Sequence, residues 1–155
     1  MKEIRVTDLL VCRQFIAPDW LEAKALIGRM MHQRIGELEE FANCEKEFDI
    51  SIEINDVLLK GRIDIACLDE NVIYEVKPKT KNKEQLRRYV LQVQIYGNMY
   101  ERVYGIKPDL FIIFYNNDSI IKQKIWYQDI LTQMEKNIVD LANLMSNGIV
   151  YIRNP

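Results

Sequence analysis

The sequence predicts a single α/β domain in which a mixed β-sheet is flanked by helices. Its 155 residues, 48% of them hydrophobic, suffice for one hydrophobic core, so we expect one domain over residues 1–155. The spacing of apolar residues changes several times between the period of a helix and that of a strand. The resulting order is αβββαββα, and strands interrupted by helices in this way favour a mixed sheet with helices on its faces.

Three segments have apolar residues at helical spacing. Pro18 suits the first position of a helix, and the apolar spacing continues to about Phe41. A second helix is expected over residues 86–103, where apolar residues recur every three or four positions. Asp129 is expected to cap a third helix that extends to Met145.

Five segments are predicted as strands. Residues 48–54 alternate strictly between apolar and polar, which is typical of a half-buried strand. Residues 58–67 and 72–77 are separated by a short polar turn, so we expect them to pair as an antiparallel hairpin. Residues 110–115 and 120–127 form a second predicted hairpin.

Charge and cysteine usage argue against several classes of protein. Lys and Arg number 21 against 23 Asp and Glu, and the net charge of −2 excludes a uniformly basic coat for nucleic acid. No apolar run is long enough to cross a membrane, and residues 1–8 lack the apolar core of a secretory signal. Cys12, Cys44 and Cys67 lie far apart and predict neither a disulfide framework nor a CxxC pair. We therefore expect a cytoplasmic, reducing setting.

The central hairpin carries two carboxylates and a lysine. Glu75 and Lys77 are two residues apart on a strand and share one side of the sheet, and folding the hairpin brings Asp64 close to Glu75. Adjacent carboxylates repel unless a cation lies between them, and hard ions such as Mg²⁺ prefer oxygen ligands. A water bound to such an ion becomes a better nucleophile, and Lys77 is placed to orient it, which predicts phosphodiester hydrolysis. Alternatively, the three residues face solvent on an edge hairpin, in a salt bridge worth roughly 0.2–1 kcal/mol.

Two helical segments are candidates for supporting this site. His32, the one histidine of the chain, lies one helical turn after Gly28 and one turn before Gly36. Because glycine has no side chain, the two glycines leave room for another group to approach this face of the helix closely. The alternative is a structural or surface histidine. Gln92 and Tyr96 are four residues apart and share a face of the second helix, which an ordinary amphipathic helix also explains.

A basic stretch follows the hairpin in a chain that is acidic overall. It offers cations to a phosphate backbone if it lies beside the carboxylates, and it is otherwise a solvated loop. Its members are Lys77, Lys79, Lys81, Lys83, Arg87 and Arg88.

In order, these motifs resemble those of the PD-(D/E)XK nuclease superfamily, in particular its RecB-like exonuclease branch, which includes the CRISPR-associated RecB-like exonucleases. The resemblance spans about residues 12–115 and implies a restriction-endonuclease-like fold, a mixed sheet with flanking helices. The motifs are Gly28-x-x-x-His32, Gly61-x-x-Asp64, Glu75-x-Lys77 and Gln92-x-x-x-Tyr96.

The resemblance implies a nuclease that uses one or two Mg²⁺ or Mn²⁺ ions to hydrolyse DNA, often single-stranded DNA or DNA ends. By this resemblance, the metal is held by His32, Asp64, Glu75 and the main-chain carbonyl of Val76. Lys77 is then expected to act on the attacking water, while Gln92 and Tyr96 support the site or the DNA strand.

The chain also departs from this family. The CRISPR-associated members carry an iron–sulfur cluster held by four cysteines, of which Cys12 matches the first and the other three are missing. We therefore expect no iron–sulfur cluster. One alternative is a catalytically inactive nuclease-fold protein that uses the basic stretch to bind DNA or a partner. Another is a restriction-type endonuclease, for whose added recognition element 155 residues leave little room. The sequence leaves open whether the domain forms a homo-oligomer.

Overall fold

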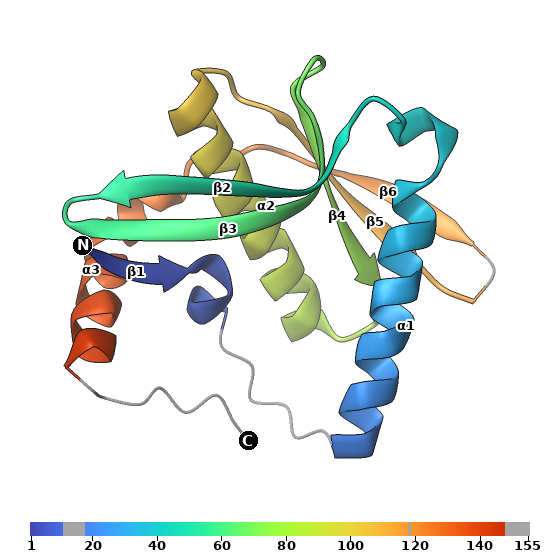
Figure 1. The fold of residues 1–155 in the computed structure, drawn as a ribbon, viewed down its shortest axis with the longest axis horizontal. Helices are drawn as coiled ribbons and strands as arrows, with labels where there is room; N and C mark the ends of the chain where they lie inside the picture. Colours follow the sequence, from blue (N-terminus) through green and yellow to red (C-terminus); the bar gives the residue numbers. More distant parts are fainter. Residues whose placement is uncertain (11–17, 118, 148–155) are drawn as a thin grey trace.

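A mixed sheet of six strands forms the centre of the computed structural model, which describes residues 1–10, 18–117 and 119–147 (Figure 1). The strands are β1 (Lys2–Arg5), β2 (Glu45–Ile54), β3 (Val57–Cys67), β4 (Val72–Pro78), β5 (Asp109–Tyr115) and β6 (Ile120–Ile125). They run in the order β1-β3-β4-β5-β6, and β2 pairs with β3 outside this path. β1 lies parallel to β3 and β4 parallel to β5, whereas the other neighbours are antiparallel.

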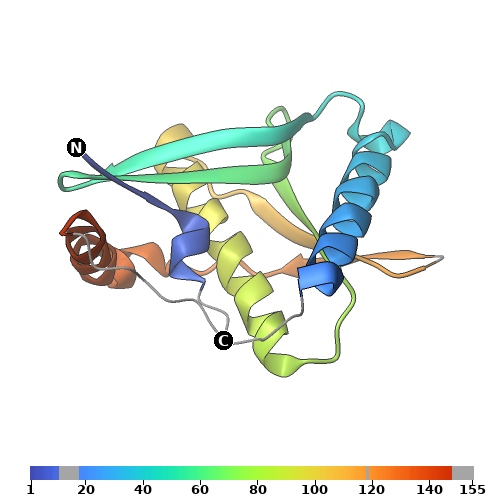
Figure 2. The same cartoon turned by 60° about the horizontal axis from the view of Figure 1, so that its bottom comes forward.

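Helices cover both faces of this sheet. α1 (Pro18–Gly36) lies against one face, and α2 (Lys83–Tyr104) and α3 (Leu131–Ser146) lie against the other (Figures 1 and 2). The predicted class, a mixed sheet with flanking helices, is therefore confirmed. Within the described ranges, no helix is both long enough and apolar enough to span a membrane.

The second helix illustrates how the sequence fixes an element. The Asn82 side chain accepts a hydrogen bond from the Gln85 N–H at 3.0 Å and caps the N-terminus. Gly105 ends the helix at a φ of 76°, a conformation that glycine adopts without a steric cost. Between these ends, Val93 and Met99 are fully buried against the sheet. The structure thus confirms the predicted helix and adds its first turn.

One predicted helix end needs correction, and one predicted helix start has a second capping residue. α1 stops at Gly36, and Phe41 belongs instead to a short 3-10 helix, Glu39–Phe41, whose phenyl ring is buried. Phe41 matches the spacing of the apolar residues of α1 by chance, because its side chain is buried as part of the separate 3-10 helix. The third helix begins at Leu131, whose N–H donates to Asn98 of α2 at 3.0 Å. Asp129 accepts the next N–H, from Thr132 at 3.5 Å, and also the Thr132 hydroxyl at 3.2 Å, so it caps the helix as predicted and shares this role with Asn98.

Most of the strand predictions are confirmed, including both antiparallel hairpins, but one strand was missed. β1 has only four residues, of which Ile4 alone is apolar, and it is fixed by parallel pairing with β3. Such pairing joins residues far apart in sequence, so local spacing does not reveal it. A 3-10 helix, Val6–Leu9, follows β1 directly. β6 ends at Ile125, two residues before the predicted end.

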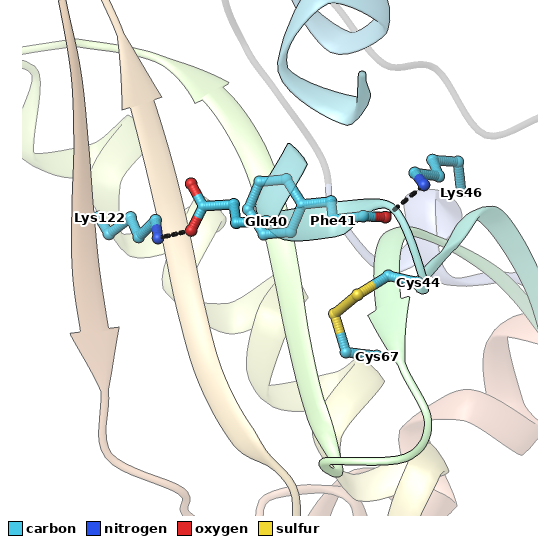
Figure 3. Close-up of a disulfide and its surroundings, with 6 residues drawn as sticks. All are labelled: Glu40, Phe41, Cys44, Lys46, Cys67 and Lys122. Atoms are coloured by element: carbon cyan, nitrogen blue, oxygen red, sulfur yellow. Dashed lines mark hydrogen bonds and ion pairs between the residues drawn. A yellow bond between two sulfur atoms is a disulfide. The ribbon is translucent and has the colours of Figure 1, made fainter. Parts of the chain in front are cut away.

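A disulfide joins Cys44 to Cys67, contrary to the prediction (Figure 3). The two residues are 23 positions apart, but the pairing of β2 with β3 brings the start of one strand beside the end of the other. The ammonium of Lys46, which follows Cys44, donates a hydrogen bond to the carbonyl of Phe41, which precedes Cys44, and this bond fixes the same connection. Wide spacing of cysteines in sequence was therefore a poor guide, and it no longer supports a reducing setting. Cys12 lies outside the described residues.

Candidate active site

The candidate site lies where β3 and β4 separate. Their paired residues run from Cys67 only as far as Ile65, which pairs with Tyr74. At the next position the carboxylates replace the backbone ladder: the Asp64 N–H donates to Glu75 Oε1 at 3.1 Å, and the Val76 N–H donates to Asp64 Oδ2 at 2.7 Å. The predicted meeting of Asp64 and Glu75 is therefore present, and each carboxylate is anchored through one oxygen atom.

The two carboxylates have opposite electrostatic environments. Glu75 is only 1% exposed, and burial together with the negative charge of Asp64 raises its pKa well above the usual range. Burial would also raise the pKa of Asp64, but His32, the Val76 N–H and Lys77 outweigh that effect and lower it. Glu75 lies in the middle of the sheet, so the alternative of a solvent-facing edge hairpin is wrong. A buried pair of like charges of this kind favours the binding of a cation.

His32 and Lys77 approach the pair from opposite sides of the sheet. His32 lies on α1, and its Nδ1 atom is 3.4 Å from Asp64 Oδ1. The Lys77 ammonium lies 3.8 Å from Glu75 Oε2 and 5.3 Å from the centre of the Tyr89 ring of α2. The structure therefore brings together all five residues that the sequence assigned to catalysis and metal binding, the fifth being Val76, whose N–H donates to Asp64.

The two predicted α2 residues lie beneath the site. Gln92 and Tyr96 are both buried, and the Gln92 side-chain amide donates to the Tyr96 hydroxyl at 3.2 Å. The ring of Tyr96 packs directly under Gly61 of β3, where an added Cβ atom would lie 2.6 Å from Tyr96 Cε1. Gly61 thus provides the space that lets this ring reach the strand carrying Asp64.

Replacing Gly61 with Ala is expected to destabilise the fold by about 1–3 kcal/mol, because the new methyl group overlaps a buried ring. Thermal unfolding measures the loss. The double variant Gly61→Ala/Tyr96→Leu is the control, because the smaller side chain leaves room for the methyl group and should recover part of the stability. A Gly61→Ala protein as stable as the wild type would contradict the close packing described above.

Two hollows open onto Asp64. One, of about 670 Å³, lies on the side of β2 and β3 that faces α2 and is lined by Asp64, Glu75 and Lys77. The other, of about 960 Å³, lies beside α1 and is lined by His32, Asp64 and Val76. Asp64 therefore lines both hollows, whereas Glu75 lines only the one that faces α2.

Glu47 lines both hollows and was missed from the sequence. It stands opposite Asp64, between the register pairs of Lys46 with Ile65 and Phe48 with Ile63. Its φ is 49°, an unusual backbone conformation for a residue other than glycine. The alternating pattern marked it only as a polar position of a strand, and no local signal distinguishes it.

The predicted basic stretch is divided by the fold. Lys77 lines the hollow beside α2, whereas the other members lie on the connection after β4 and on the first turns of α2, outside the lining of either hollow. These are Lys79, Lys81, Lys83, Arg87 and Arg88. The cations that share the hollow with Lys77 are instead Arg5, Lys60 and Arg62, from β1 and β3. A DNA-binding role for the five outer residues stays a prediction.

The donor atoms suit a hard divalent cation. Asp64 and Glu75 each use one oxygen on a backbone N–H, and their other oxygens, Asp64 Oδ1 and Glu75 Oε2, face His32 at 3.4 Å and the Lys77 ammonium at 3.8 Å. A bound cation would take the place of these two contacts. Mg²⁺ commonly binds through one or two carboxylates and completes its shell with water and phosphate oxygens. In the ranges that the structure describes, no group of three or more His, Cys, Asp or Glu side chains is arranged to hold a metal ion, so the two carboxylates alone offer the core of a site. The arrangement therefore fits an open site, in which substrate or water supplies the remaining ligands.

Comparisons with known proteins support the fold. No protein-family model and no curated protein matches the sequence. The crystal structure of SSO0001 matches with a TM-score of 0.70 at 19% identity, over 92% of this chain and 76% of that one. A protein from Eubacterium rectale, named "Putative exonuclease", matches with a TM-score of 0.55 at 16% identity, over 94% of this chain and 61% of that one. K. lactis Dxo1 in complex with manganese aligns over 56% of this chain at a TM-score of 0.29, too partial for comparing folds. The chain thus shares its fold with the first two.

Proposed function

We propose that this protein is a divalent-metal-dependent nuclease that hydrolyses DNA phosphodiester bonds, acting as an exonuclease on single-stranded DNA or DNA ends. The observation that carries the proposal is the buried pair of Asp64 and Glu75 at the strand separation, with the ammonium of Lys77 3.8 Å from Glu75. A surface salt bridge would not require a fully buried glutamate beside a second carboxylate, whereas a cation site does. The shared fold with a protein named as an exonuclease is consistent with this function.

In this proposal, the metal would be held by Asp64 and Glu75, with His32 and the main-chain carbonyl of Val76 completing the protein's share. When bound, Mg²⁺ or Mn²⁺ supplies the positive charge that polarises the phosphate and acidifies a water molecule. The Lys77 ammonium orients the attacking water and offsets the charge that grows on a phosphoryl oxygen. The Tyr89 ring lies beneath that ammonium and favours its position.

Replacing Lys77 with Ala is expected to lower cleavage by about 100- to 1,000-fold, the scale of losing one preorganised charged donor. The fold should persist, because Lys77 is partly exposed and adds little to the core. The assay follows end-labelled single-stranded, linear double-stranded and closed circular DNA with Mg²⁺, Mn²⁺, Ca²⁺ or EDTA. Lys136→Ala, which removes an exposed lysine of α3, is the matched control.

The outcomes separate the alternatives. Degradation of linear DNA with circles spared, lost in Lys77→Ala and kept in Lys136→Ala, supports an exonuclease with this site. Cutting of circles keeps the site and rejects the exonuclease assignment. Equal cleavage by Lys77→Ala and the wild type would reject the assignment of Lys77. Salt-sensitive DNA binding without cleavage under any metal would favour the inactive, DNA-binding alternative.

A further inference from the structure

Tyr115 ends β5 on the face of the sheet that α1 covers. Its side chain is 9% exposed and belongs to the cluster that includes Ile35 of α1 and Val76 of β4. The hydroxyl lies 3.8 Å from the position of a Cβ atom at Gly28. Gly28 is one helical turn before His32, and both residues line the hollow beside α1 that reaches Asp64. Tyr115 itself is not among the residues that line this hollow, and its hydroxyl lies behind Gly28, at the edge of the hollow.

The Tyr115 hydroxyl has no hydrogen-bond partner among the residues that the structure describes, although it is buried. Other tyrosine hydroxyls of this protein do form such bonds. They belong to Tyr89 with Gln85, Tyr96 with Gln92, Tyr100 with Asn71 and Tyr127 with Glu101. Tyr74 and Tyr104 form no such bond within the described residues either. What distinguishes Tyr115 is that its hydroxyl lies beside Gly28, which lines the hollow that reaches Asp64, so a group bound in that hollow is placed to accept its hydrogen bond.

The surroundings indicate what that group is. Burial and the charge of Asp64 both raise the pKa of Tyr115, so its hydroxyl stays protonated and is able to donate. Lys77 approaches the carboxylates from the side of α2, as its contact with Tyr89 shows, whereas Tyr115 lies on the side of α1. A phosphate bound between the two hollows would find a cationic donor on one side and this neutral donor on the other.

We propose that Tyr115 is a substrate-binding residue whose hydroxyl donates a hydrogen bond to a phosphate oxygen of nucleic acid held at Asp64. This inference rests on the proposed function and deepens it. Gly28 has a defined part in it, since the absence of a side chain there keeps the approach to the hydroxyl open.

Replacing Tyr115 with Phe tests the proposal, because the ring and its packing remain and only the hydroxyl is lost. We expect about a 10-fold lower kcat/KM for DNA cleavage, together with weaker binding of a fluorescein-labelled single-stranded oligonucleotide in Ca²⁺, and an unchanged melting temperature. Tyr74→Phe is the matched control. Tyr74 belongs to the same cluster, but its hydroxyl is influenced by Lys122 and Glu40 rather than by Asp64.

Gly28→Ala provides a second variant, which is expected to differ from Tyr115→Phe in its melting temperature. A methyl group 3.8 Å from the hydroxyl is in ordinary contact, so the fold tolerates it, and alanine favours the helix. We expect a higher melting temperature together with a lower kcat/KM and weaker oligonucleotide binding. A variant that is more stable and equally active would count against the open approach.

The readouts distinguish this inference from the function on which it rests. If the wild type cleaves DNA and Tyr115→Phe matches it in both kcat/KM and oligonucleotide affinity, the inference is overturned and the nuclease function stands. If the wild type binds the oligonucleotide without cutting, the nuclease function fails, and the affinity of Tyr115→Phe alone decides the inference. If the wild type neither binds nor cuts, both are overturned.

Discussion

The Glu75→Gln protein is expected to lose DNA cleavage by about 1,000-fold or more, and yet to unfold at a higher temperature than the wild type in EDTA at neutral pH. Glutamine keeps the shape and the acceptor oxygen for the Asp64 N–H but carries no charge. Losing a metal-binding carboxylate removes several kcal/mol of charge stabilisation from the transition state. The same change removes a buried charge beside Asp64, which should stabilise the metal-free fold by about 1–3 kcal/mol.

The pH dependence follows from the raised pKa of Glu75. Its ordinary value is 4.5, and in the fold burial and Asp64 raise it well above that. Between these two values the folded protein holds a proton that the unfolded chain has lost, so stability decreases as pH rises through this window. Below it both states are protonated, and the contribution is fully present. The difference in melting temperature between Glu75→Gln and the wild type should therefore widen as pH rises from about 4.5.

Metal and a surface variant complete this test. Saturating Mg²⁺ should raise the melting temperature of the wild type and leave that of Glu75→Gln unchanged, because only a ligand bound to the folded state stabilises it. Glu45→Gln, an exposed change at the start of β2, is expected to behave as the wild type throughout. If the Glu75→Gln protein is less stable than the wild type at every pH, the protein itself compensates the charge of Glu75 and no metal ion is needed for that.

Sequence reasoning succeeded where the signal is local. The alternation of β2 and the helical spacing of α2 both reflect one buried face, and each was read correctly. The hairpin of β3 and β4 was also predictable, since a short polar turn leaves antiparallel pairing as the simple outcome. Once that pairing is known, the meeting of Asp64 and Glu75 follows from the register alone.

The features that were missed depend on contacts distant in sequence. β1 is held by parallel pairing with β3, and the hollow's cations Arg5 and Arg62 come from these two strands rather than from the basic stretch. Tyr115 looked like one more apolar position of a strand, because only the packing of α1 shows where its hydroxyl lies. That β3 and β4 separate at Asp64 likewise depends on side chains replacing a ladder bond, which no periodicity reveals.

Reducing the Cys44–Cys67 disulfide is expected to cost about 3 kcal/mol of stability, the entropy of closing a loop of this length in the unfolded chain. For a domain of this size, that lowers the melting temperature by roughly 6–12 °C. The bond ties the connection after α1 to the end of β3, beside the buried ring of Phe41 (Figure 3). Thermal unfolding with and without dithiothreitol measures the effect, and a thiol assay in denaturant should count two more thiols per chain after reduction.

A variant without the bond separates its effect from that of the reductant. Cys44→Ser/Cys67→Ser should melt near the reduced wild type, and dithiothreitol should not shift it further. The connection that the bond fixes follows the helix carrying His32. Loss of the disulfide should therefore loosen the packing of that helix more than the strands carrying Asp64 and Glu75. Cleavage by the variant is therefore expected to survive at low temperature and to fail on heating before that of the oxidised wild type. Equal melting temperatures with and without reductant, despite the change in thiol count, would show that β2 and β3 pairing alone holds this connection.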